Sequence, residues 1–167
     1  MARLAQSTAT LRVRGDDLVP DEITRLLGCP PSSSFAKGDI VRGKSTGREY
    51  VKRSGLWRIE TSDREPEDLD TQVSELLSRL TQDLSVWADL ARRFKIDLFC
   101  GLFMETSNEG TEVSSTTLRS LGERGIVLAL DVYAPTRDIV ESEPCPCGSG
   151  RSYGECCMSP TSVSSGP

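Results

Sequence analysis

Four of the six cysteines in this 167-residue chain lie within thirteen residues near its C-terminal end. They are Cys145, Cys147, Cys156 and Cys157. Zinc in structural sites takes four ligands in a tetrahedron, and four thiolates fill that set without leaving a position for water. Gly148 and Gly150 can adopt positive φ angles, which would let the chain fold back over a metal. The spacing therefore predicts one structural zinc ion.

The same segment is too polar to fold by hydrophobic burial, because Tyr153 is its one large apolar side chain. Metal binding would have to supply its folding free energy, of order 10 kcal/mol for such sites. Two other interpretations stay open, a pair of disulfides and a redox switch. A bridge between the adjacent Cys156 and Cys157 would be strained, and a reducing compartment disfavours disulfides.

The segment from Pro144 to Cys157 resembles the SEC-C motif, the zinc-binding tail of the SecA translocation ATPase that also ends many unrelated bacterial proteins. The resemblance implies that the four cysteines are the metal ligands. SecA-type tails dock on the SecB chaperone with the help of basic residues. Here Arg151 is accompanied by the acids Glu141, Glu143 and Glu155, which argues against SecB as the partner.

The preceding residues have the periodicities of an α+β domain. Strands are predicted at 9–13, 56–60, 96–104 and 126–133, and helices at 20–27, 69–80, 84–94 and 114–121. Residues 29–50 are rich in Ser, Gly and Lys and are interpreted as a long loop with a short strand near Ile40 and Val41. Trp57 and Trp87 are expected to be core anchors. Interspersed strands and helices favour one sheet with helices mainly on one face, and a ferredoxin-like sandwich is the favoured version.

The change in composition after Tyr133 divides the chain into four parts. The α+β domain covers 8–134, an acidic linker 135–143, the zinc knob 144–158 and a disordered, Ser-rich tail 159–167.

Six short stretches of the larger domain resemble the bacterial family called domain of unknown function 4279. They are Gly15-Asp16, Leu18 to Ile23, Leu27 to Pro31, Lys37-Gly38-Asp39, Gly55-Leu56-Trp57 and Leu130 to Tyr133. The resemblance implies a small α+β fold and supplies no activity. Domains of this kind occur beside toxin-immunity and defence proteins, so an immunity role follows by association only.

Catalysis is disfavoured by the composition, because the chain contains no histidine. Cys29 therefore lacks the usual base for a cysteine nucleophile, and Cys100 lies in a strand expected to be buried. The acids Asp16, Asp17, Asp21 and Glu22 could form a metal cluster, but charge at a helix N-terminus explains them more simply.

Charge and hydropathy limit the partners. The net charge of −5 argues against a nucleic-acid backbone or an anionic membrane as a general target, and no apolar run is long enough to span a bilayer. The basic stretch 37–53 has no aromatic residue before Tyr50, so we interpret it as a solvated loop rather than a site for nucleic acid or an acidic partner.

The sequence thus predicts a cytoplasmic, non-enzymatic protein with a zinc knob and a protein partner. In an immunity role that partner would be a toxin. The alternative is a SEC-C adaptor whose partner is a chaperone or export component, or which acts in ribosome-associated handling. An enzyme that uses a carboxylate site is the third hypothesis.

Overall fold

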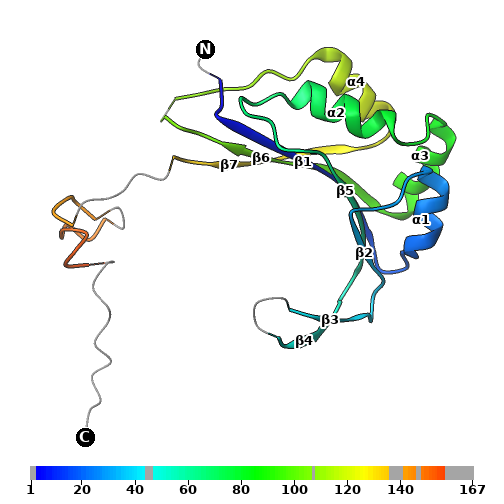
Figure 1. The fold of residues 1–167 in the computed structure, drawn as a ribbon, viewed down its shortest axis with the longest axis horizontal. Coiled ribbons are helices and arrows are strands. Elements are labelled where there is room, and N and C mark those ends of the chain that lie inside the picture. Colours follow the sequence, from blue (N-terminus) through cyan, green and yellow to red (C-terminus); the bar gives the residue numbers. More distant parts are fainter. Residues whose placement is uncertain (1–2, 44–46, 107, 136–140, 146–147, 157–167) are drawn as a thin grey trace, which may run out of the picture. The chain divides into compact units, whose positions relative to one another are not determined.

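The computed structural model describes residues 3–43, 47–106, 108–135, 141–145 and 148–156 (Figure 1). The chain divides into two compact units, Met1–Pro135 and Thr136–Pro167. The elements of the first unit are β1 (Gln6–Gly15), α1 (Pro20–Leu27), β2 (Ser33–Phe35), β3 (Ile40–Arg42), β4 (Glu49–Val51), β5 (Gly55–Glu60), α2 (Leu69–Ser78), α3 (Leu84–Arg93), β6 (Lys95–Phe103), α4 (Ser115–Glu123) and β7 (Val127–Tyr133).

The main sheet has the strand order β2-β5-β1-β6-β7. Its central strand β1 is antiparallel to β5 and β6, whereas β6 and β7 are parallel. A parallel pair needs a crossover connection, which α4 provides. The helices lie on one face of the sheet (Figure 1). The predicted α+β class with one sheet and helices on one face is confirmed.

The favoured ferredoxin-like version is compatible with this topology and stays a prediction. That fold follows the order β-α-β-β-α-β. β1, α1, β2, β5, α2 and β6 follow one another in that order, and α3, β3, β4, α4 and β7 are additional elements.

The core lies between the sheet and its helices. Trp57 on β5 and Trp87 on α3 are both 0 % exposed. Their indole Nε1 groups donate to Thr24 Oγ1 at 3.0 Å and to the Thr81 carbonyl at 2.9 Å, so burial leaves neither indole N–H without an acceptor. Both tryptophans are core anchors, as predicted. The longest described helices have ten residues, and no described helix could cross a membrane.

The prediction of a long loop over 29–50 is wrong except near Ile40 and Val41. β2 pairs with β5 and β3 pairs with β4 in one continuous antiparallel register, with Phe35 opposite Leu56 and Ile40 opposite Val51. The two strand pairs thus follow each other in the same register although they belong to different sheets, and we call the segment 33–58, described at 33–43 and 47–58, the bent hairpin. Its three-residue strands β2, β3 and β4 are held by backbone hydrogen bonds and bury no continuous apolar face, so hydrophobic periodicity did not reveal them.

Helix ends follow the predicted signals. Pro20 stands in the first turn of α1, and Gly28 ends that helix at φ 76°, a conformation that favours glycine. Ser114 caps α4, and its hydroxyl accepts a hydrogen bond from the Thr117 amide at 3.2 Å.

Asp68 caps α2, and its replacement by alanine should destabilise the first unit. Its Oδ1 accepts from the Thr71 amide at 3.1 Å, and hydrogen bonds from the Thr71 side chain and backbone lower the pKa of Asp68. We expect Asp68→Ala to cost about 1 kcal/mol in urea unfolding at neutral pH. A lowered folded-state pKa gives stability that is present above the unfolded-state pKa and lost as the pH falls through the folded-state value.

Wild type and the Asp68→Ala variant should therefore converge in stability in acid. Asp17→Ala, at an exposed position before α1, is the matched control and should change stability little. A loss of equal size at neutral and acidic pH would show that the Asp68 carboxylate does not act as the cap.

Candidate metal centre

The described part of the second unit folds back on itself through backbone hydrogen bonds. The Cys145 amide donates to the Arg151 carbonyl at 2.8 Å, and the Tyr153 amide donates to the Glu143 carbonyl at 2.8 Å. An isolated antiparallel bridge joins Pro144 to Ser152 between these two bonds. The two ends of the cysteine segment are thus brought together. This fold-back comprises the described residues of the predicted knob and the preceding residues 141–143.

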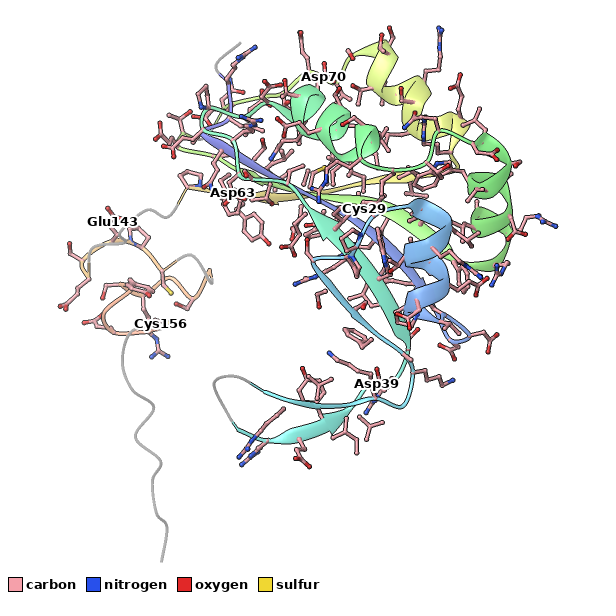
Figure 2. All side chains as sticks on the ribbon, turned by 45° about the vertical axis from the view of Figure 1, so that its right-hand side comes forward. Cys29, Asp39, Asp63, Asp70, Glu143 and Cys156 are labelled. Carbon is pink, nitrogen blue, oxygen red and sulfur yellow. The ribbon has the colours of Figure 1, made fainter. Side chains whose placement is uncertain are left out.

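Two of the four predicted ligands lie in the described part of the knob. Cys145 is 5 % exposed, although few apolar side chains are near it in sequence. Gly148 and Gly150 have φ angles of 76° and 74°, so both adopt the positive φ that the fold-back requires. The Ser149 hydroxyl donates to Cys156 Sγ at 3.2 Å (Figure 2 labels Cys156). Hydroxyl and amide donors to sulfur are typical of the surroundings of metal-bound thiolates.

The other two predicted ligands, Cys147 and Cys157, lie outside the described residues. Among the residues that the structure does describe, no three Cys, Asp or Glu side chains come together as a possible metal centre. The predicted linker 135–143 is described only at residue 135 and at 141–143, and the predicted tail 159–167 lies outside the described residues altogether.

The acids at positions 16, 17, 21 and 22 do not gather into a second metal centre. Asp16 pairs with Lys37 at 2.5 Å, and the hydrogen bond from that ammonium lowers the pKa of Asp16. Glu22 pairs with Arg93 at 2.8 Å. Cations therefore engage two of the four carboxylates, in line with the simpler interpretation of these acids as surface and helix-end charges.

No described residue acts as a base beside either cysteine of the first unit. Cys100 is 0 % exposed, and burial raises the pKa of its thiol to about 12, so it is a core residue as predicted. Cys29 is 8 % exposed. Its Sγ lies 3.8 Å from Arg79 Nη2 and 3.6 Å from the Pro30 carbonyl oxygen, and neither group can accept a proton from it as a catalytic base.

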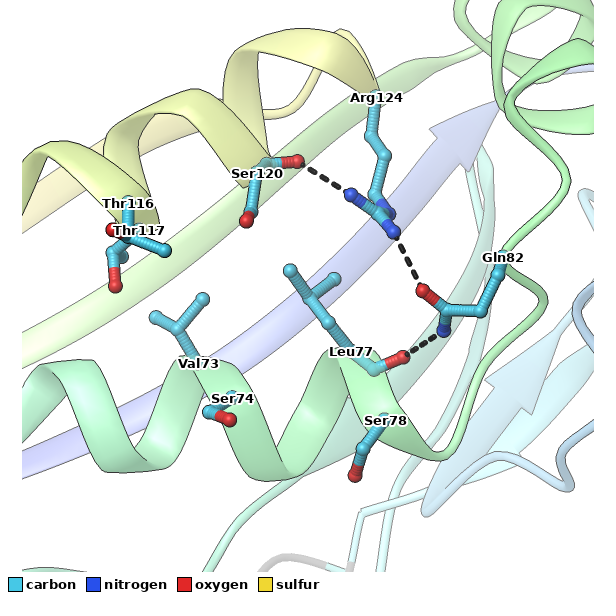
Figure 3. A pocket seen from close by; sticks show the side chains of 9 residues that line it. All are labelled: Val73, Ser74, Leu77, Ser78, Gln82, Thr116, Thr117, Ser120 and Arg124. Atoms are coloured by element: carbon cyan, nitrogen blue, oxygen red, sulfur yellow. Dashed lines mark hydrogen bonds between the residues drawn. The ribbon is translucent and has the colours of Figure 1, made fainter.

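A cavity of about 260 Å³ lies between α2 and α4 and was not expected from the sequence (Figure 3). The Arg124 guanidinium, in a residue 9 % exposed, donates to the Ser120 carbonyl at 3.0 Å and to Gln82 Oε1 at 2.8 Å. Gln82 Nε2 in turn donates to the Leu77 carbonyl at 2.8 Å. These bonds tie together the C-terminal ends of α2 and α4, where a cation is favoured and an anionic ligand is not.

Comparison with known proteins accounts for both units. The SEC-C motif matches residues 142–159, which include all four clustered cysteines. No curated protein and no solved structure matches the chain. The family described as Domain of unknown function (DUF4279) matches residues 5–135, a range that includes every strand and helix of the first unit. The chain therefore belongs to the DUF4279 family and carries a C-terminal SEC-C motif.

Proposed function

We propose that this chain is a non-enzymatic zinc-binding protein-interaction module. The DUF4279 domain recognises a protein partner, and the zinc knob provides a second contact surface. The observation that carries the proposal is the fold-back of the knob, which buries Cys145 and places a hydroxyl donor on the sulfur of Cys156 in a segment with few apolar side chains. Such a segment needs another source of folding free energy, and metal binding supplies it.

The metal ligands in this proposal are Cys145, Cys147, Cys156 and Cys157. Four sulfur donors suit zinc and leave no open position for water or substrate, so the metal is structural. Four thiolates and one Zn²⁺ carry a charge of −2, which the single arginine of the segment, Arg151, partly offsets. When bound, the ion supplies folding free energy, and the chain's own residues present the surface.

The non-enzymatic part of the proposal is supported by the surroundings of the candidate groups. The sequence contains no histidine. The contacts of Cys29 are an arginine and a carbonyl, and Cys100 lies in the core. Asp16 and Glu22 are engaged by cations. Among the described residues, none of these groups has an adjacent base of the kind that nucleophilic catalysis needs.

The test is affinity purification of the tagged full chain from the organism that carries the gene. Wild type and Cys29→Ser are expected to recover the same partner, and Cys156→Ser is expected to lose most of it because its knob does not fold. A toxin would identify an immunity role, and a chaperone or export component would identify an adaptor. If Cys156→Ser recovers the same partner, the knob does not take part in the interaction. If neither wild type nor a variant recovers a partner, the proposal is contradicted.

A further inference from the structure

The bent hairpin (residues 33–58) encloses a groove on one of its faces. The register places Phe35 opposite Leu56 and Val41 opposite Tyr50, and side chains at alternate positions of an antiparallel pair share a face. A groove of about 460 Å³ lies there, and its lining includes Phe35, Val41, Tyr50, Lys52, Leu56 and Arg58. In Figure 1, β3 and β4 extend away from the helices beyond the ends of β2 and β5. The groove floor is thus apolar and aromatic, and three cationic residues, Arg42, Lys52 and Arg58, also line the groove.

The bent hairpin differs in charge from the rest of the chain. Residues 33–58 contain seven Lys or Arg and two Asp or Glu, a net charge of +5 in a chain whose net charge is −5. The remainder of the chain therefore carries −10. Such a separation of charge steers an acidic partner toward the hairpin and away from other surfaces.

The groove presents hydrogen-bond donors that a ligand can reach. Lys52 Nζ lies 4.0 Å from the ring centroid of Phe35 and 4.7 Å from that of Tyr50, and no described carboxylate lies within ion-pair distance of it. Arg58 Nη2 pairs with Glu60 at 3.2 Å, but 42 % of the Arg58 side chain is exposed, so its guanidinium can still donate to a ligand in the groove. A partner carboxylate would accept a charge-assisted hydrogen bond from it.

The sheet face beside the groove also carries cationic side chains. Leu56 lies opposite Arg14 and Arg58 lies opposite Arg12 in the β1–β5 register, so the arginines of β1 adjoin the groove. Asp97 neutralises part of their charge through ion pairs with both Arg12 and Arg14. The Arg14 side chain is nevertheless 39 % exposed. Within the first unit the helices cover only the opposite face of the sheet (Figure 1).

We propose that this groove binds an extended acidic segment of a partner protein. Apolar side chains of the segment pack on Phe35, Tyr50 and Leu56, and its carboxylates accept hydrogen bonds from Lys52 and Arg58. The inference rests on the proposed function and names the class of partner. A short segment fits better than a nucleic acid, because a phosphate backbone needs a continuous cationic track. Glu60 and Asp97 interrupt the cations on this face.

The test uses the full chain and a fluorescein-labelled random copolymer of glutamate and tyrosine, with a labelled oligo-dT of similar length as the comparison probe. Fluorescence anisotropy should show saturable binding of the copolymer that weakens as salt is added. Lys52→Glu should weaken that binding by about tenfold or more, because it places a like charge in the groove. Arg119→Glu makes the same charge change at an exposed position on α4 and should alter the affinity by less than about twofold.

Location and folding are checked on the same samples. Amide chemical shifts of the full chain should change on β2, β4 and β5 when the copolymer is added, and the far-ultraviolet circular dichroism of Lys52→Glu should equal that of wild type. Tyr50→Ala, at a residue 48 % exposed, provides a second groove variant without a charge change and should also weaken binding.

Three results would overturn the groove. The first is that the copolymer does not bind at low salt, and the second is that Arg119→Glu weakens binding as much as Lys52→Glu does. The third is that oligo-dT binds more tightly than the copolymer and that Lys52→Glu abolishes this binding, which would make the groove a nucleic-acid surface. If the copolymer fails while affinity purification still recovers a partner that Cys156→Ser loses, the groove inference fails and the proposed function stands.

Discussion

Cys145→Ser is expected to abolish zinc binding and unfold the knob while the DUF4279 domain stays folded. Wild type purified without chelator should contain about one zinc per chain. A serine hydroxyl does not lose its proton to a bound metal as readily as a cysteine thiol does. The variant therefore keeps three of the four sulfur ligands. Structural zinc sites contribute about 10 kcal/mol or more of folding free energy, and the sequence of the knob offers few apolar side chains to replace it.

The two units can be followed separately in this experiment. Both tryptophans, Trp57 and Trp87, lie in the first unit, so tryptophan fluorescence during urea unfolding reports on that unit alone. Its transition should be the same in Cys145→Ser and wild type. Cys29→Ser makes the same chemical change outside the cluster and should retain the metal.

Two results would contradict the zinc hypothesis. One is wild-type protein that contains no metal and whose cluster thiols do not respond to added zinc. The other is a Cys145→Ser variant that binds a full equivalent of zinc with undiminished affinity.

The candidate metal centre could be proposed from sequence because its four predicted ligands are close together in the chain. All four cysteines fall within thirteen residues, and the glycines that permit the turns lie between them. The positive φ angles of Gly148 and Gly150 follow from that local chemistry. The groove could not be predicted in this way. Phe35 and Arg58 are 23 positions apart, and only the register of the bent hairpin brings them to one face.

The fold shows the same difference between features set by local sequence and features set by distant parts of the chain. The strand predicted at 96–104 corresponds to β6, whose burial on both faces gives an apolar run that can be read directly. The apolar strand predicted at 126–133 corresponds to β7, but it lies at the edge of the sheet, with Val127 57 % and Val132 56 % exposed. An apolar sequence indicates a strand and does not by itself tell whether a neighbour covers it.

Gln72 is the clearest case of a core residue that periodicity does not identify. It is 0 % exposed within α2. Its Nε2 donates to the carbonyls of Ser7 at 3.2 Å and Ser62 at 2.9 Å, and its Oε1 accepts from the Ser7 hydroxyl at 2.7 Å. Ser7, also 0 % exposed, belongs to β1, so this amide joins the helix layer to the central strand. Buried polar groups that are fully bonded in this way hold neighbouring elements in one arrangement.

Gln72→Glu is therefore expected to be among the most destabilising substitutions of similar volume in this chain. It replaces an NH₂ donor with a charged oxygen that faces two carbonyl oxygens in a site without water access. The expected cost is about 4 kcal/mol at neutral pH, a large part of the 5–15 kcal/mol typical of a domain. Urea unfolding followed by tryptophan fluorescence measures it.

The pH dependence separates the charge from the loss of hydrogen bonds. Burial and the carbonyl oxygens of Ser7 and Ser62 should raise the pKa of the introduced carboxyl above its unfolded value. Stability linked to a raised folded-state pKa is present below the unfolded-state pKa and is lost as the pH rises through the folded-state value. The Gln72→Glu variant should thus approach wild type as the pH falls, whereas Gln72→Leu, which removes the same bonds without a charge, should show a nearly constant deficit. A constant deficit in both variants would mean that the introduced carboxyl reaches water, and that the junction between α2 and β1 opens more readily than the burial of Gln72 implies.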